Sequence, residues 1–92
     1  MDRDRLEAAL AREFDAGPAA RRVVARQAMD LADSGQLEGD LGVALEVETV
    51  VANLADAPAE YGLRERWNWW LGALSLSHGG YDRFAVRATR DR

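Results

Sequence analysis

The sequence contains no cysteine, and its one imidazole is that of His78. The absence of cysteine excludes disulfides, thiolate metal sites and thiol nucleophiles. A single histidine cannot build a histidine-based zinc site within one chain. Lysine is absent as well, so arginine supplies every other basic side chain. From these absences we expect no bound metal and no cofactor.

Long apolar runs are also missing, and none approaches the roughly 20 residues that a membrane span requires. The chain opens with alternating charges at Asp2, Arg3, Asp4 and Arg5 instead of a basic stretch followed by an apolar one. This pattern does not match a secretory signal peptide. We therefore expect a cytoplasmic protein without a membrane partner.

The length of 92 residues predicts one small domain over residues 1–92, with a thin hydrophobic core. Its charge is unevenly distributed along the chain. Residues 1–56 carry a net charge of −6, whereas residues 57–92 carry +2 and contain all three tryptophans. An anionic partner would therefore bind the second half of the chain.

Helical periodicity is clearest in three segments. A helix is expected over about 4–15, with Asp4 as its N-cap, and a second over 18–34, with Pro18 in its first turn and Gly35 after its end. A further helix is expected over about 60–76. Residues 40–56 carry a helical stripe, although alternation over 41–47 also permits a short strand there.

The C-terminal segment has the two-residue period of a half-buried strand, because Phe84, Val86 and Ala88 alternate with polar residues. Residues 72–77 contain a similar alternation, and 78–81 could form the turn between them. The predicted fold is therefore mostly α within the α+β class. It consists of about four helices and a C-terminal β-hairpin, 72–77 with 82–88, or an extended tail.

Residue types of a hydrolase triad occur together near the C-terminus. They are Ser75, Ser77, His78 and Asp82. Triad members usually come from separate parts of a fold, and this cluster has neither a nucleophile elbow nor an oxyanion loop. His78 is also well explained as a residue in the last turn of a helix. We therefore expect no catalytic residues and no enzyme.

Residues 40–54 loosely resemble a helix-turn-helix, through the pattern Leu-x-x-Ala-Leu-x-Val over 41–47. The resemblance implies DNA binding, but the segment is about two residues too short for the motif. Its second helix would contain Glu48 and no arginine, which argues against phosphate and base contacts there.

A winged-helix arrangement is a second route to DNA binding. Residues 60–71 would enter the groove and 74–88 would form the wing. The expected nucleic-acid contacts are then Arg64, Arg66, Arg83 and Arg87. Alternatively, these arginines only keep a small domain soluble.

The segment 67–76 has more apolar surface than one helix face needs. Trp67 and Trp70 fall on the expected core stripe, whereas Trp69 points nearly the opposite way. The predicted partner interface consists of Trp69, Gly72, Ala73 and Leu76. Alternatively, the chain covers this face itself, with Phe14, Val51, Phe84 or Val86.

The predicted function is a non-catalytic binding or regulatory module that associates with itself as a homodimer or with another protein. A small winged-helix DNA-binding regulator is the alternative.

Overall fold

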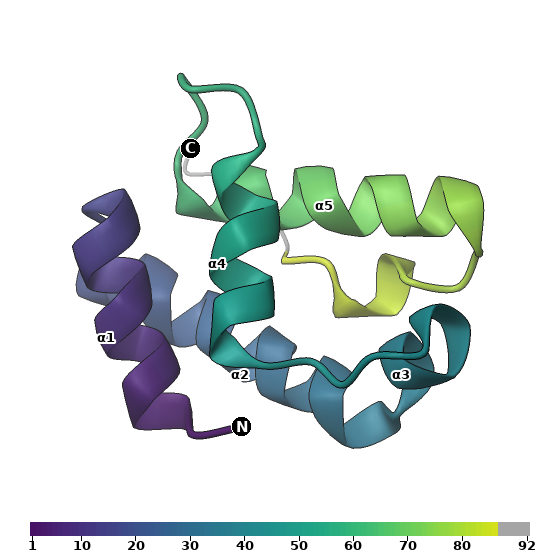
Figure 1. Ribbon diagram of the computed structural model, residues 1–92. Helices are drawn as coiled ribbons and strands as arrows, with labels where there is room; N and C mark the ends of the chain where they lie inside the picture. The colour runs from purple at the N-terminus through teal and green to yellow at the C-terminus, as the bar shows by residue number, and fades with distance from the viewer. Residues whose placement is uncertain (87–92) are drawn as a thin grey trace.

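The computed structural model describes residues 1–86, which form five α-helices and one 3-10 turn (Figure 1). Short loops join these elements, and none of the described residues forms a β-strand. The elements in chain order are α1 Arg3–Phe14, α2 Pro18–Ser34, α3 Gln36–Leu41, α4 Val47–Ala55, α5 Leu63–Ser77 and η1 Asp82–Phe84.

Local sequence explains the boundaries of the first two helices. The carboxylate of Asp2 accepts hydrogen bonds from the backbone N–H groups of Asp4 and Arg5, so Asp2 is the N-cap of α1 and the prediction of Asp4 as N-cap was wrong. Helix α2 begins at Pro18 and ends before Gly35, which adopts a φ of 72° that favours glycine. The predicted range 18–34 is therefore confirmed.

Helices α2 and α5 contact each other, and Figure 1 shows them running in the same direction, one below the other. Helix α4 crosses in front of them and packs against α1 and α5, while α1 packs across the start of α2. Beyond α5 the chain turns back, and η1 lies between α5 and α2. The turn η1 is therefore packed between two helices.

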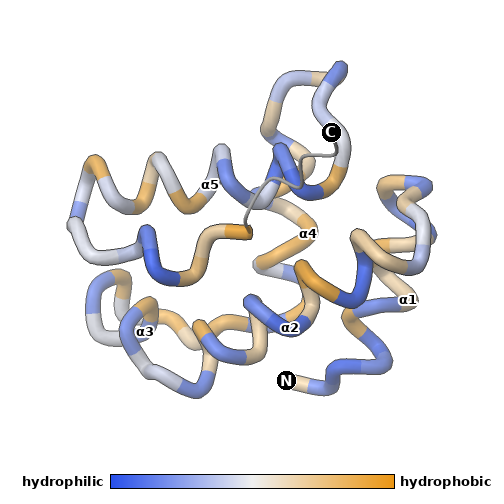
Figure 2. The backbone as a smooth tube through the Cα atoms, turned by 180° about the vertical axis from the view of Figure 1, so that it is seen from behind, coloured by the Kyte–Doolittle hydropathy of each residue, from blue (hydrophilic) through white to orange (hydrophobic). Residues whose placement is uncertain are grey.

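One connected hydrophobic core joins all of these elements. Hydrophobic and hydrophilic residues alternate along the helices, as expected when only one side of each helix is covered (Figure 2). The core includes two of the three tryptophans. The largest completely buried side chains are those of Trp67, Tyr81, Leu6, Leu10, Leu31, Leu37, Leu54, Leu71, Val24 and Val50.

The predicted β-hairpin is wrong, and with it the assignment to the α+β class. Residues 72–77 are the last turns of α5, and 82–84 form the 3-10 turn η1. Leu74 is buried and Leu76 is exposed, so their alternation with serines arises from opposite sides of a helix. Residues 87 and 88 of that hairpin lie outside the described part.

The helix number was also wrong, because residues 36–41 form a helix of their own. Gly42 ends α3 with a φ of 76°, and α4 begins only at Val47, after Glu46 in extended conformation. The alternative strand over 41–47 is not formed either. Within residues 1–86, no helix is both long enough and apolar enough to span a lipid bilayer.

Candidate functional site

Helix α5 presents apolar side chains on two sides. Its inner side is buried in the core and consists of Leu63, Trp67, Trp70, Leu71 and Leu74. On the other side Trp69 is 37 % exposed and Leu76 is 91 % exposed, the largest value among the large apolar residues of 1–86. The second apolar side is therefore directed to solvent.

We call Trp69, Gly72, Ala73 and Leu76 the outer α5 face, and all four residues are exposed. A Cβ atom added at Gly72 would meet no atom within 4 Å, so nothing in the described chain lies over the middle of this face. Phe84 and Val86, two residues considered as its cover, are buried in the core instead. The sequence-predicted interface residues thus lie together on the surface.

A shallow depression of about 350 Å³ adjoins this face at the start of α5. Trp69 and Asn68 form one side, and Tyr61 and Glu65 complete it. The Glu65 carboxylate accepts a hydrogen bond from the Gly62 backbone N–H at 2.7 Å, which caps the helix. The depression therefore extends the exposed surface of Trp69 toward a polar rim.

The two buried tryptophans of α5 pack against each other and hold the C-terminal segment. The rings of Trp67 and Trp70 meet edge to face, with centroids 5.6 Å apart and planes at 77°. Trp67 Nε1–H donates to the backbone carbonyl of Phe84 at 2.9 Å. This bond satisfies a buried indole donor and attaches the returning chain to α5.

Asn68 binds both backbone polar groups of Val86. Its Oδ1 accepts from the Val86 N–H at 2.8 Å, and its Nδ2 donates to the Val86 carbonyl at 2.8 Å. Sequence analysis missed this role. Asparagine is a poor residue for a helix interior, so its place between two tryptophans was the available signal of a specific hydrogen-bonding role.

Tyr81 anchors the beginning of the same segment. Its side chain is completely buried, and its hydroxyl donates to Asp40 Oδ2 at 2.7 Å. Burial and the nearby carboxylate raise the pKa of Tyr81 to about 12, because both disfavour the phenolate. The ring therefore stays neutral and joined to the end of α3 at neutral pH.

The residues considered for a catalytic triad are not arranged as one. Ser75 Oγ donates directly to Asp82 Oδ1 at 3.1 Å and accepts from the Tyr81 N–H at 3.2 Å. Ser77 Oγ bonds to backbone carbonyls of its own helix, and His78 is exposed. These contacts stabilise the turn after α5. Within residues 1–86, no three His, Asp or Glu side chains gather as a metal site.

Two of the four arginines expected at nucleic acid are bound within the protein. Arg66 donates to the backbone carbonyls of Leu54, Tyr61 and Ala59 at 2.9, 3.0 and 3.3 Å, and its guanidinium lies 5.2 Å from the Phe14 ring centroid. It therefore closes the loop between α4 and α5.

Arg83 donates to Gln36 Oε1 at 2.6 Å and lies over the Phe84 ring. Arg64 is half-buried, and Arg87 lies outside the described residues. The expected wing is not formed over 74–86. DNA binding by residues 57–92 stays a prediction, and the described structure does not contain the β-wing on which that prediction was based.

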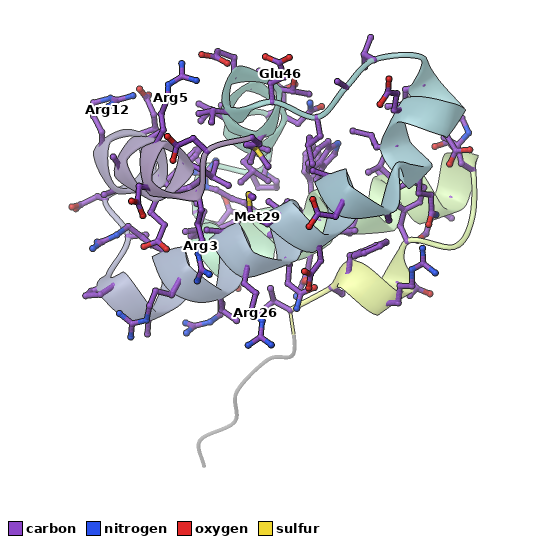
Figure 3. All side chains as sticks on the ribbon, turned by 90° about the horizontal axis from the view of Figure 1, so that it is seen from below. Arg3, Arg5, Arg12, Arg26, Met29 and Glu46 are labelled. Atoms are coloured by element: carbon purple, nitrogen blue, oxygen red, sulfur yellow. The ribbon has the colours of Figure 1, made fainter. Side chains whose placement is uncertain are left out.

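Apart from the depression beside Trp69, an apolar groove lies between α1 and α4. It was not anticipated from the sequence. Its volume is about 350 Å³, and small residues such as Ala8, Val51 and Ala52 line it. Arg5 and Glu48 form an ion pair at its edge. A backbone hydrogen bond and Arg5 together lower the pKa of Glu48. Arg5, Arg12 and Glu46 lie along this side of the molecule (Figure 3).

Comparison with known proteins gives one match. No curated protein and no solved structure matches the chain. The family described as "WNWW domain" matches residues 1–75, most of the 92-residue chain. The matched part contains the segment Trp67-Asn68-Trp69-Trp70, whose side chains form the α5 contacts described above. It ends before Tyr81–Val86, the segment that Trp67 and Asn68 hold. The chain belongs to the WNWW domain family.

Proposed function

We propose that this protein is a non-catalytic binding module that associates with a second copy of itself through the outer α5 face. The supporting observation is the exposure of Leu76 and Trp69 on one side of a helix whose other side is buried. Tryptophan is among the residues most enriched at binding hot spots, and an unpaired apolar side costs free energy in water. The cytoplasmic location expected from the sequence is part of this proposal.

The spacing of the outer α5 face suits a two-fold interface. Trp69 and Leu76 lie at equal sequence distances from the midpoint between Gly72 and Ala73. If two α5 helices pair antiparallel about an axis at this midpoint, Trp69 of each copy meets Leu76 of the other. Seven residues of helix span about 10 Å, so both contacts fit within one interface.

The small residues in the middle permit close approach of the two helices. Gly72 and Ala73 project little or nothing from the helix, and the space around Gly72 is open. Helix axes pack about 8–10 Å apart, at the lower end when the contact residues are small. In this arrangement Trp69 and Leu76 of each copy are buried against Leu76 and Trp69 of the other. The two helix backbones approach each other between these contacts, at Gly72 and Ala73.

Charge does not oppose this pairing locally. None of the four residues of the outer α5 face is charged, although the whole protein carries −4. Added salt therefore screens the general repulsion between copies and breaks no ion pair of the interface. Because the face is small, we expect a weak dimer, with a dissociation constant on the order of 10–100 µM.

Sedimentation at increasing protein concentration tests the proposal. The unaltered chain should shift from monomer to dimer, and Leu76→Ser should abolish the shift without changing the helical content. Val43→Ser is the matched control, because Val43 is 52 % exposed but lies before α4, outside the proposed interface. A chain that stays monomeric at about 1 mM, well above the expected dissociation constant, would contradict the proposal.

A further inference from the structure

The segment Tyr81–Val86 is held in the manner of a bound peptide. The side chains of Tyr81, Phe84 and Val86 are buried, whereas those of Asp82, Arg83 and Ala85 are exposed. Apart from the short turn η1, the segment joins no helix or sheet. Its burial therefore depends on three side chains that enter the protein, as anchor residues of a peptide ligand do.

Side chains of the helices, not their backbones, bind the backbone of this segment. Trp67 and Asn68 hold Phe84 and Val86 through three hydrogen bonds of 2.8–2.9 Å. Ser75 Oγ accepts from the Tyr81 N–H. Asn68 makes the pair of bonds that a neighbouring β-strand would make, so it recognises extended backbone whatever the side chain.

The second wall of this groove comes from the other side of the molecule. Asp40 accepts a hydrogen bond from the Tyr81 hydroxyl, and Gln36 Nε2 donates one to the Gly80 carbonyl at 2.8 Å. Helix α2 also contacts η1. Figure 1 shows the turn enclosed between α5 above and α2 and α3 below. The groove therefore has polar groups on both walls and an apolar floor.

The covalent link between groove and segment is short and rich in glycine. Residues 78–80 follow the end of α5, and both Gly79 and Gly80 adopt positive φ values of 78° and 81°. Glycine permits many other backbone conformations at these positions, so the link can open without strain. The groove residues Gln36, Asp40, Trp67, Asn68 and Ser75 all fall within the family match to residues 1–75, whereas the segment follows it.

We propose that the groove formed by α2, α3 and α5 is a peptide-binding site that accepts the segment Tyr81–Val86 of a second copy of this chain as well as its own. The pattern it recognises is Tyr-x-x-Phe-x-Val, with a 3-10 turn over Asp82–Phe84 and extended backbone at Ala85. Exchange of the segment between two copies preserves its hydrogen bonds and its buried contacts, because the segments are identical. The attached segment competes at an effective concentration in the millimolar range, which keeps exchange infrequent in the unaltered chain.

A labelled peptide of sequence Gly-Tyr-Asp-Arg-Phe-Ala-Val, capped at both ends, tests this site by fluorescence anisotropy. The full chain with Phe84→Ala and Val86→Ala keeps the groove but weakens its own segment. We expect this variant to bind the peptide at least tenfold more tightly than the unaltered chain does. A peptide with both aromatic residues replaced by alanine should bind at least tenfold more weakly.

Matched variants identify the groove. Adding Asn68→Ala to the double variant should weaken peptide binding at least tenfold, whereas adding Asn53→Ala should not, because the Asn53 side chain donates to the Thr49 carbonyl of its own helix. Adding Leu76→Ser should also leave peptide binding unchanged, which separates this site from the outer α5 face. A folded double variant that fails to bind, or binds equally without Asn68, overturns the proposal.

Hydrogen exchange of the unaltered chain provides a second test that does not depend on the double variant folding. The Tyr81 and Val86 N–H groups, bound by Ser75 and Asn68, should exchange through an opening that leaves the amides of α5 protected. If they exchange only when α5 itself unfolds, the segment is inseparable from the fold and the proposal is wrong.

Discussion

The side-chain amide of Asn68 and the backbone of Val86 form two hydrogen bonds of 2.8 Å, across 18 residues of sequence. This pair, with the bond from Trp67 to the Phe84 carbonyl, fixes the path of the chain after α5. Two adjacent residues of one helix thus hold the backbone of Phe84 and Val86 against α5.

Replacing Asn68 with alanine should destabilise the protein by about 1–3 kcal/mol, because both backbone groups of Val86 lose their partner in a partly buried place. Urea unfolding followed by circular dichroism measures the change. Asn53→Ala is the control: it removes one bond within α4 and improves helix propensity, so its effect should stay within about 0.5 kcal/mol. Equal effects of the two variants would show that the Val86 bonds do not contribute.

The tryptophans of α5 should differ sharply in their effect on stability. Trp67→Phe leaves the Phe84 carbonyl unpaired and a space in the core, so we expect a loss of about 2–4 kcal/mol. Trp69→Phe, on the exposed face, should cost less than about 0.5 kcal/mol. Thermal unfolding at a concentration that keeps the chain monomeric compares them. A large loss from Trp69→Phe would mean that this ring supports the fold.

Stability should fall at high pH because of Tyr81. Its folded-state pKa is raised to about 12, above the ordinary value of 10 that applies in the unfolded chain. Its contribution is therefore fully present below pH 10 and is lost as the pH rises through 12. The chain has neither lysine nor cysteine, and Tyr61 is its one other tyrosine.

Tyr81→Phe should make the free energy of unfolding less dependent on pH between 10 and 12, the ordinary and the raised pKa of this tyrosine. Tyr61→Phe should leave the decline in place. Urea unfolding at several pH values gives the comparison, and tyrosinate absorbance follows ionisation directly. An unchanged slope in Tyr81→Phe would assign the decline to another group.

Arg66→Lys should be destabilising even though it conserves the charge. The guanidinium bonds to three backbone carbonyls in the loop between α4 and α5 and stacks over Phe14, which the smaller ammonium group cannot reproduce. We expect a loss of about 1–3 kcal/mol. Arg64→Lys is the matched control and should change the free energy of unfolding by less than about 0.5 kcal/mol.

The fold was predictable where its causes are local. The range of α2 follows from Pro18 and Gly35, and the two apolar sides of α5 follow from residue spacing. The exposure of Leu76 was one of two alternatives left open by the sequence, and the structure decided between them. The break between α3 and α4 was missed, since the helical stripe over 40–56 continued through Gly42.

The site was predictable only in part, because residue spacing shows which residues share a helix face but not how the helices pack. Residue spacing brought Trp69, Gly72, Ala73 and Leu76 onto one face of α5. It could not show that Arg66 is bound by carbonyls of Leu54, Ala59 and Tyr61, because the geometry of a loop between two helices depends on how those helices pack. Arg66 was expected among the DNA contacts, and its place in this loop was not predicted.

The amino-acid sequence by itself determined the range of α2, the glycine that ends it and the second apolar side of α5, because periodicity and capping act over a few residues. Only the tertiary structure decided that the C-terminal segment returns between α5 and α2 instead of forming a hairpin. Its hydrogen-bond partners include Gln36, Asp40, Trp67 and Asn68, up to 47 residues distant, and such long-range pairing depends on the positions of helices already packed. A two-residue alternation indicates which side chains of a segment are buried, but not what they are buried against.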